Sequence, residues 1–130
     1  MALGGLSVAR RIVTLDAFGT LVELEDPVPR LVAALGARGL AVSAAQARAA
    51  LAEEIAFYRA GHDAGVDAAS LALLRGRCAQ VLRGGLERAG ADTSAVTPAA
   101  MVAALLAALR FVAFADVPGA LAALRAAGHR

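Results

Sequence analysis

The sequence predicts a mostly helical α/β protein, in which one N-terminal strand precedes a block of about four helices and a further helix follows. Two observations support this prediction. Residues 11–15 form a short, apolar, β-branched run that ends at Asp16, which is typical of a buried strand. Much of the remaining chain is rich in Ala, the strongest helix former, and residues that favour helix N-caps stand before its apolar stretches.

The composition indicates one domain that does not enter a membrane. The chain has 130 residues and is 59% hydrophobic, although much of that fraction is Ala, which buries little area per residue. The longest apolar run, residues 99–109, is about half of the roughly 20 residues that a membrane-spanning helix needs. The N-terminus lacks the pattern of a signal peptide. We therefore expect a cytoplasmic protein without membrane partners.

Charge and cysteine content exclude several classes of function. The formal net charge is +2, and all 13 basic residues are Arg, spread along the chain singly or in pairs. No basic run is interleaved with aromatic residues, so we expect no nucleic-acid partner. Cys78 is the single cysteine, which rules out a disulfide or a cysteine zinc site within the chain and predicts a buried structural thiol.

Capping and turn residues set the expected helix bounds. Ser43 followed by Gln46 forms a capping box, and Asp67 can cap the next helix. Thr97 is the expected N-cap of a helix whose first residue is Pro98. The expected helices span residues 27–37, 44–60, 68–83 with a continuation to 89, 98–109, and 117–127.

Four further expectations concern the segments between and within these helices. Residues 21–24 alternate apolar and polar side chains, which predicts a short extended or hairpin-like segment, and residues 111–114 are expected to be a short apolar link. The pair Gly84-Gly85 is expected to weaken or kink the third helix. Glu53 and Glu54 are expected to be solvated.

The turn after the predicted strand carries the candidate chemistry. Asp16 would stand at the C-terminal end of that strand, where open α/β sheets bind their ligands. Gly19 permits a positive φ or a close approach of backbone to ligand, and Thr20 adds a hydroxyl that can orient the carboxylate or bind an anion. The competing interpretation is that Asp16 is only a turn or N-cap acid.

This stretch, Asp16-Ala17-Phe18-Gly19-Thr20-Leu21, resembles the first motif of the haloacid dehalogenase-like hydrolases, which reads Asp-x-x-Gly-Thr-Leu after an apolar strand. Residues 114–118 and 121–128 are similar to the return of that family's chain from a helical cap to its core. The resemblance implies a partial Rossmann-like core with an inserted α-helical cap. Its expected parts are residues 1–21 as first core strand and nucleophile turn, 22–110 as cap, and 111–130 as an incomplete return to the core.

The resemblance also implies roles for single residues. Asp16 would be a nucleophile that forms an aspartyl intermediate, while Phe18, Gly19 and Thr20 would bind a small anionic substrate. Tyr58, Arg59 and His62, which stand together where the second helix ends, would line the cap and touch the substrate. The alternative for these three is a half-exposed Tyr, an Arg whose stem lies on apolar surface, and a loop His.

Phe18 leaves the reaction open, because phosphatases of the family carry a second acid at this position and that acid protonates the leaving group. A phosphatase acting on a small phosphorylated substrate would use Mg²⁺ bound by Asp16 and the backbone carbonyl of Phe18. A 2-haloacid dehalogenase would need no metal. The chain ends at Arg130, before the family's later motifs, so we expect a piece of a longer enzyme that is inactive alone, or one completed by another chain or by oligomerisation. The remaining alternative is a non-catalytic helical interaction module.

Overall fold

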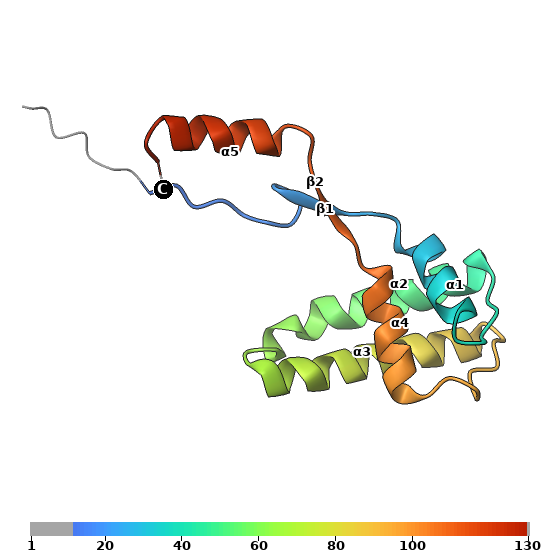
Figure 1. The fold of residues 1–130 in the computed structure, drawn as a ribbon. Helices are drawn as coiled ribbons and strands as arrows, with labels where there is room; N and C mark the ends of the chain where they lie inside the picture. The colour runs from blue at the N-terminus through green and yellow to red at the C-terminus, as the bar shows by residue number, and fades with distance from the viewer. Residues whose placement is uncertain (1–11, 130) are drawn as a thin grey trace, which may run out of the picture. The chain divides into compact units, whose positions relative to one another are not determined.

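The computed structural model describes residues 12–129, and most of these residues are helical, as the sequence predicts. They form five α-helices, one 3₁₀ turn and a small two-stranded antiparallel sheet (Figure 1). The elements in chain order are β1 (Val22–Leu24), α1 (Pro27–Gly36), α2 (Ala44–Gly61), η1 (His62–Ala64), α3 (Ala68–Arg88), α4 (Pro98–Ala108), β2 (Phe111–Ala113) and α5 (Val117–Ala126).

The chain divides into two compact units. The helical unit, residues 25–110, holds α1 to α4 and η1. The terminal unit is built from both ends of the chain, and its described residues are 12–24 and 111–129. These residues contain β1, β2 and α5.

The prediction of a buried strand over residues 11–15 is wrong where the structure describes it. Residues 12–17 belong to no strand, and Arg11 lies outside the described residues. The side chains of Ile12 and Leu15 are 82% and 44% exposed. A strand requires a neighbour that pairs with its backbone groups, and no described segment pairs with residues 12–15. The apolar run over residues 12–15 therefore forms no hydrogen-bonded pairing with another described segment.

The sheet of the terminal unit joins two segments that are far apart in sequence. β1 pairs antiparallel with β2, in the register Val22 to Ala113, Glu23 to Val112 and Leu24 to Phe111. The extended segment expected at residues 21–24 is thus confirmed, whereas the link expected at 111–114 is in part a strand. After β2, the amide of Phe114 donates to the carbonyl oxygen of Leu21 at 3.2 Å, and α5 begins three residues later.

Local capping fixes the starts of the helices, as predicted. Ser43 and Gln46 form a reciprocal capping box, and Asp67 forms another with Ser70. Thr97 accepts a hydrogen bond from the amide of Ala100 at the start of α4. The helix bounds agree with the predicted ones to within one or two residues, and α3 takes the longer of its two expected lengths.

The helical unit has a continuous apolar core between its four helices. α2 packs along α3, α4 lies against α1 and α3, and α1 also contacts α2 (Figure 1). The largest completely buried side chains are Leu31, Leu35, Leu82, Leu86 and Met101. Burial of each such side chain contributes roughly 1.5–3 kcal/mol, so this unit has a hydrophobic core of its own.

The pair Gly84-Gly85 does not interrupt α3, contrary to the kink that the sequence suggests. Gly85 is buried where α3 crosses α2, and a Cβ at this position would lie 2.8 Å from the Cα of Ala50. The absence of a side chain lets the two helix backbones approach closely, and this close packing offsets the flexibility of glycine.

Glu54 is buried, so the prediction of a solvated side chain is wrong. It follows Ala47, Ala50 and Leu51 on the buried face of α2, and its carboxyl shares a hydrogen bond with the thiol of Cys78 on α3. Burial raises the pKa of Glu54, while the Cys78 hydrogen bond acts in the opposite direction. Burial, this hydrogen bond and the Glu54 charge raise the pKa of Cys78 to about 12. Cys78 is thus the buried, unreactive thiol that the sequence predicts.

A second polar network fixes the connection from α3 to α4. The guanidinium of Arg83 donates to the carbonyl oxygen and the hydroxyl of Thr93, both at 2.9 Å, and to the carbonyl oxygen of Val96 at 2.5 Å. The Thr93 hydroxyl in turn donates to a carboxylate oxygen of Glu87. One cation thus satisfies two backbone carbonyls of the loop, which orders it against α3.

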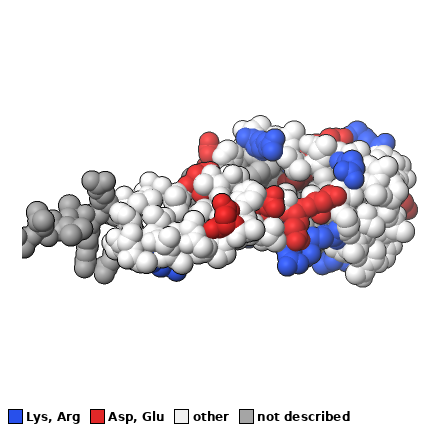
Figure 2. Space-filling model, turned by 90° about the horizontal axis from the view of Figure 1, so that it is seen from above, with Lys and Arg blue, Asp and Glu red and all other residues white. Residues whose placement is uncertain are grey.

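None of the helices in residues 12–129 combines the length and apolar character needed to cross a membrane. On the face of the helical unit that Figure 2 shows, basic and acidic side chains lie next to one another. This face therefore presents no extended patch of one charge.

Candidate functional site

Asp16 lies at the start of a tight turn whose backbone is closed by its own hydrogen bonds. The amides of Leu21 and Val22 donate to the carbonyl oxygen of Ala17 at 2.8 and 2.9 Å, and the amide of Gly19 donates to the carbonyl oxygen of Val22 at 2.9 Å. Gly19 has a φ of +77°, a conformation that L-residues rarely adopt. The motif's glycine is therefore required by the turn itself.

The carboxylate of Asp16 has one weak partner within this turn. The hydroxyl of Thr20 donates to Oδ2 of Asp16 at 3.4 Å, in the orienting role that the sequence suggests for Thr20. Neither side chain is buried, and Oδ1 accepts no hydrogen bond from the described residues. Within residues 12–129, Asp16 thus presents one carboxylate oxygen without a partner and one that is loosely held.

The backbone of the turn leaves several polar groups unused within residues 12–129. The amides of Phe18 and Thr20 donate no hydrogen bond there, and the carbonyl oxygen of Phe18 accepts none. Free amides next to a carboxylate are the groups that bind an anionic substrate in oxyanion-type sites. The turn therefore supplies a nucleophile, a hydroxyl and two amide donors within five consecutive residues.

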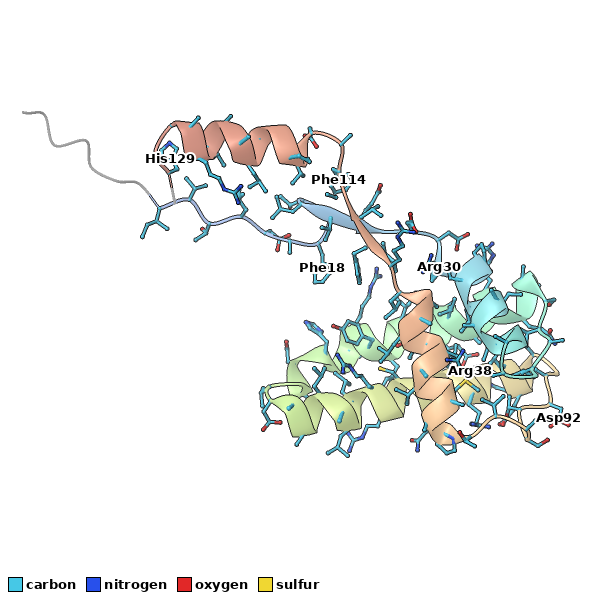
Figure 3. The ribbon with its side chains drawn as sticks, in the orientation of Figure 1. Phe18, Arg30, Arg38, Asp92, Phe114 and His129 are labelled. Atoms are coloured by element: carbon cyan, nitrogen blue, oxygen red, sulfur yellow. The ribbon has the colours of Figure 1, made fainter. Side chains whose placement is uncertain are left out.

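Phe18 is exposed for two thirds of its surface and packs on one other ring. Its centroid lies 5.1 Å from that of Phe111 on β2, with the two ring planes tilted by 56°. Figure 3 shows Phe18 on the segment before β1 and Phe114 just after β2. The ring contact ties the turn to the sheet of the terminal unit.

Tyr58, Arg59 and His62 lie in the helical unit, at the end of α2 and the start of η1. The rings of Tyr58 and His62 are 5.7 Å apart, and Nδ1 of His62 lies 3.2 Å from the carbonyl oxygen of Arg59. Nε2 of His62 lies 3.3 Å from a carboxylate oxygen of Asp63. All three candidates are exposed and stand together, but Asp16, Phe18, Gly19 and Thr20 belong to the other unit.

A magnesium site is incomplete in the part of the chain that the structure describes. Asp16 contributes a carboxylate and Phe18 a backbone carbonyl, which are ligands of the type that Mg²⁺ prefers. No group of three or more His, Cys, Asp or Glu side chains that could hold a metal occurs within residues 12–129. These residues alone therefore do not form a metal centre.

The helical unit also contains a groove, and none of its residues is a candidate from the sequence. It is open to solvent, has a volume of about 360 Å³ and lies along α2 and α3. Its lining residues are Phe57, Arg77, Gln80, Val81, Gly84 and Arg88. Those from α3 recur three or four residues apart along one face of the helix, with Gln80 and Val81 adjacent, and this helical period is the sequence signal for the groove.

Comparisons of the chain with known protein families, with curated proteins and with solved structures found no match.

Proposed function

We propose that the chain carries the nucleophile turn and helical cap of a haloacid dehalogenase-like hydrolase, with Asp16 as the nucleophile. The observation that carries the proposal is the Asp16 turn, in which the motif's Gly adopts a positive φ and the motif's Thr hydroxyl donates to Asp16. In support, a complete helical unit is inserted between two strands that pair with each other. This is the arrangement expected of a cap inserted between two core segments.

The proposed chemistry begins with attack by Oδ1 of Asp16 on an electrophilic phosphorus or carbon atom of a small anionic substrate. The leaving group departs with its bonding electrons, and an aspartyl ester or acyl phosphate forms. Thr20 holds Oδ2, which directs Oδ1 toward the substrate, while the amides of Phe18 and Thr20 bind the anionic group. Attack by water then releases the product and restores Asp16. In a phosphatase, Mg²⁺ would be held by Asp16 and the carbonyl of Phe18, and it would neutralise phosphate charge.

The phosphatase and dehalogenase forms of the proposal differ at Phe18. A phosphate ester loses an alkoxide that needs a proton, and a positioned general acid is typically worth about 10²–10⁴-fold in rate. Phe18 has no proton to give, whereas a halide leaves without one. The side chain of Phe18 is therefore an argument for the alternative, a 2-haloacid dehalogenase, and against a small-molecule phosphatase.

One experiment with labelled water tests the proposal and separates its two forms. The chain, alone and within any longer protein that contains it, is incubated in H₂¹⁸O with phenyl phosphate or with 2-chloropropionate, and release of phosphate and chloride is measured. Water attacks the phosphorus of an acyl phosphate but the carbonyl carbon of an alkyl ester. A phosphatase therefore places ¹⁸O in the released phosphate, and a dehalogenase places it in the carboxylate of Asp16, which peptide mass spectrometry detects.

Two variants complete the test. We expect Asp16→Asn to abolish release and labelling, because a carboxamide is a far weaker nucleophile than a carboxylate. Asp116→Asn is the matched control, since Asp116 is an exposed acid of the same unit that makes no capping hydrogen bond. Hydrolysis that survives Asp16→Asn would rule out the nucleophile.

The second candidate is a non-catalytic helical interaction module. It is favoured by one observation, namely that the helical unit has its own buried core while the terminal unit exposes Ile12 and Leu15. Absence of turnover and of ¹⁸O in Asp16 for both substrates, also within any longer protein that contains the chain, would support this candidate.

A further inference from the structure

The groove along α2 and α3 combines apolar walls with hydrogen-bond donors. The ring of Phe57 from α2, the side chain of Val81 and the bare backbone at Gly84 form its apolar surface. Arg77, Gln80 and Arg88, whose side chains end in hydrogen-bond donors, also line the groove. A volume of 360 Å³ stands near the lower end of the range for small-molecule sites, which is roughly 300–1,000 Å³.

The cationic groups of the groove differ in how they are held. Arg88 pairs with Glu53 of α2, and this pairing offsets its charge. A Cβ at position 84 would lie 3.2 Å from Nη1 of Arg88, so glycine leaves room for the guanidinium to lie against α3. Arg77 forms no hydrogen bond or ion pair within residues 12–129. The guanidinium of Arg88 is thus already held by Glu53, whereas the positively charged guanidinium of Arg77 has all its hydrogen-bond donors available for a ligand.

We propose that this groove binds a small aromatic carboxylate. The Arg77 guanidinium pairs with the carboxylate in the bidentate geometry that this side chain favours, and Gln80 donates from the neighbouring turn of α3. The flat ring of the ligand stacks on Phe57 and covers Val81 and Gly84. The proposal involves only residues of the helical unit, so its failure would leave the role of Asp16 untouched.

Titration of the ¹⁵N-labelled full chain with sodium benzoate, followed by amide chemical shifts, tests this site. We expect shifts confined to residues of α2 and α3 around the groove, with a Kd of about 1 mM for so small a ligand. Acetate, which lacks the ring, and benzyl alcohol, which lacks the charge, should each bind at least about tenfold more weakly, since each loses one of the two contacts.

Three variants decide which residues bind the ligand. Arg77→Ala should weaken benzoate binding by at least about tenfold, because it removes the charge-assisted hydrogen bonds. Arg75→Ala is the matched control, because Arg75 is an exposed Arg of the same helix outside the groove, and it should retain the affinity. Gly84→Ala should lower the affinity several-fold, because its methyl group would occupy the bare backbone surface that the ligand ring covers, without loss of helix.

Two results would overturn the proposal. One is an absence of localised shifts up to about 10 mM benzoate, tenfold above the expected Kd. The other is an equal loss of affinity in Arg75→Ala and Arg77→Ala, which would reveal only diffuse attraction between a basic helix and an anion.

Discussion

The substitution Gly85→Ala tests how α2 and α3 pack. A Cβ at position 85 would lie 2.8 Å from the Cα of Ala50 and 3.0 Å from its Cβ. These distances are too short for carbon atoms, and one of the two contacts is with backbone, which cannot rotate away. Overpacking of this kind costs roughly 1–3 kcal/mol. Because Ala is the better helix former by about 0.5–1 kcal/mol, we expect a net loss of about 1–2 kcal/mol in the free energy of unfolding.

Gly76→Ala is the matched control for this experiment. Gly76 lies in the same helix, and a Cβ there would meet no atom within 4 Å. Only the helix-propensity effect remains, so this variant should be more stable than the parent by about 0.5–1 kcal/mol. Urea denaturation followed by circular dichroism at 222 nm compares the parent with both variants. A Gly85→Ala variant as stable as Gly76→Ala would refute the close approach of the two helices.

Two further predictions concern the polar groups of the helical unit. Burial raises the pKa of Glu54 above its ordinary 4.5, so the native state holds this proton more tightly than the unfolded chain does. The stability that this proton contributes is complete below pH 4.5 and is lost as the pH rises through the native pKa of Glu54. The stability of Glu54→Gln relative to the parent should therefore increase from pH 4 to pH 7, as urea midpoints measure. A difference between the two midpoints that stays the same at every pH would contradict the burial of Glu54. Arg83→Ala should cost about 2 kcal/mol, because it leaves the carbonyl oxygens of Thr93 and Val96 without their charged donor. Arg75→Ala is its exposed control, and an equal cost in both variants would show that the network adds nothing.

The sequence predicts the helices of this chain well because their signals are local. Ser43 needs only Gln46, three residues away, to close a capping box, and Thr97 needs only the first turn of α4. These interactions form within one turn of helix and do not depend on what packs against it. Helix bounds therefore follow from the chain order alone.

Strand pairing depends on distant segments, and here the prediction from sequence is wrong. Residues 12–15 have the composition of a strand, yet a strand forms only where another segment pairs with it. Phe111–Ala113 has a similar apolar character and does pair, with β1, about 90 residues earlier in the chain. Composition gives the tendency of a segment to be extended, but the choice of partner is set by the whole fold.

The burial of Glu54 departs from the prediction although the sequence carries a signal for it. Glu54 continues the apolar positions 47, 50 and 51 at helical spacing, which indicates that it shares their face. The expectation of a solvated side chain rests on charge instead of position, because Glu is rarely buried without a partner. The partner is the thiol of Cys78, which sequence patterns do not identify as a hydrogen-bond acceptor or donor for a distant acid.

The Asp16 turn shows which part of the proposed chemistry is intrinsic to the motif. Its closing hydrogen bonds all lie within residues 17–22, and the Thr20 contact reaches back only to Asp16. The turn thus keeps its geometry even though the segment before it belongs to no strand. The motif and the adjoining Val22 therefore supply the hydrogen bonds that close the turn around the carboxylate of Asp16, the hydroxyl of Thr20 and the amides of Phe18 and Thr20.

Positive charge is the quantity that distinguishes the two proposed substrates. The described residues of the terminal unit contain three acids, Asp16, Glu23 and Asp116, but only one Arg, Arg125. Transfer of a phosphoryl dianion requires several positioned cations, whereas a 2-haloacid carries a single negative charge. A phosphatase would therefore need Mg²⁺ and further basic groups from outside these residues, whereas a dehalogenase would need less positive charge. Labelling of Asp16 by ¹⁸O with 2-chloropropionate, without labelled phosphate from phenyl phosphate, is the outcome that this charge difference predicts.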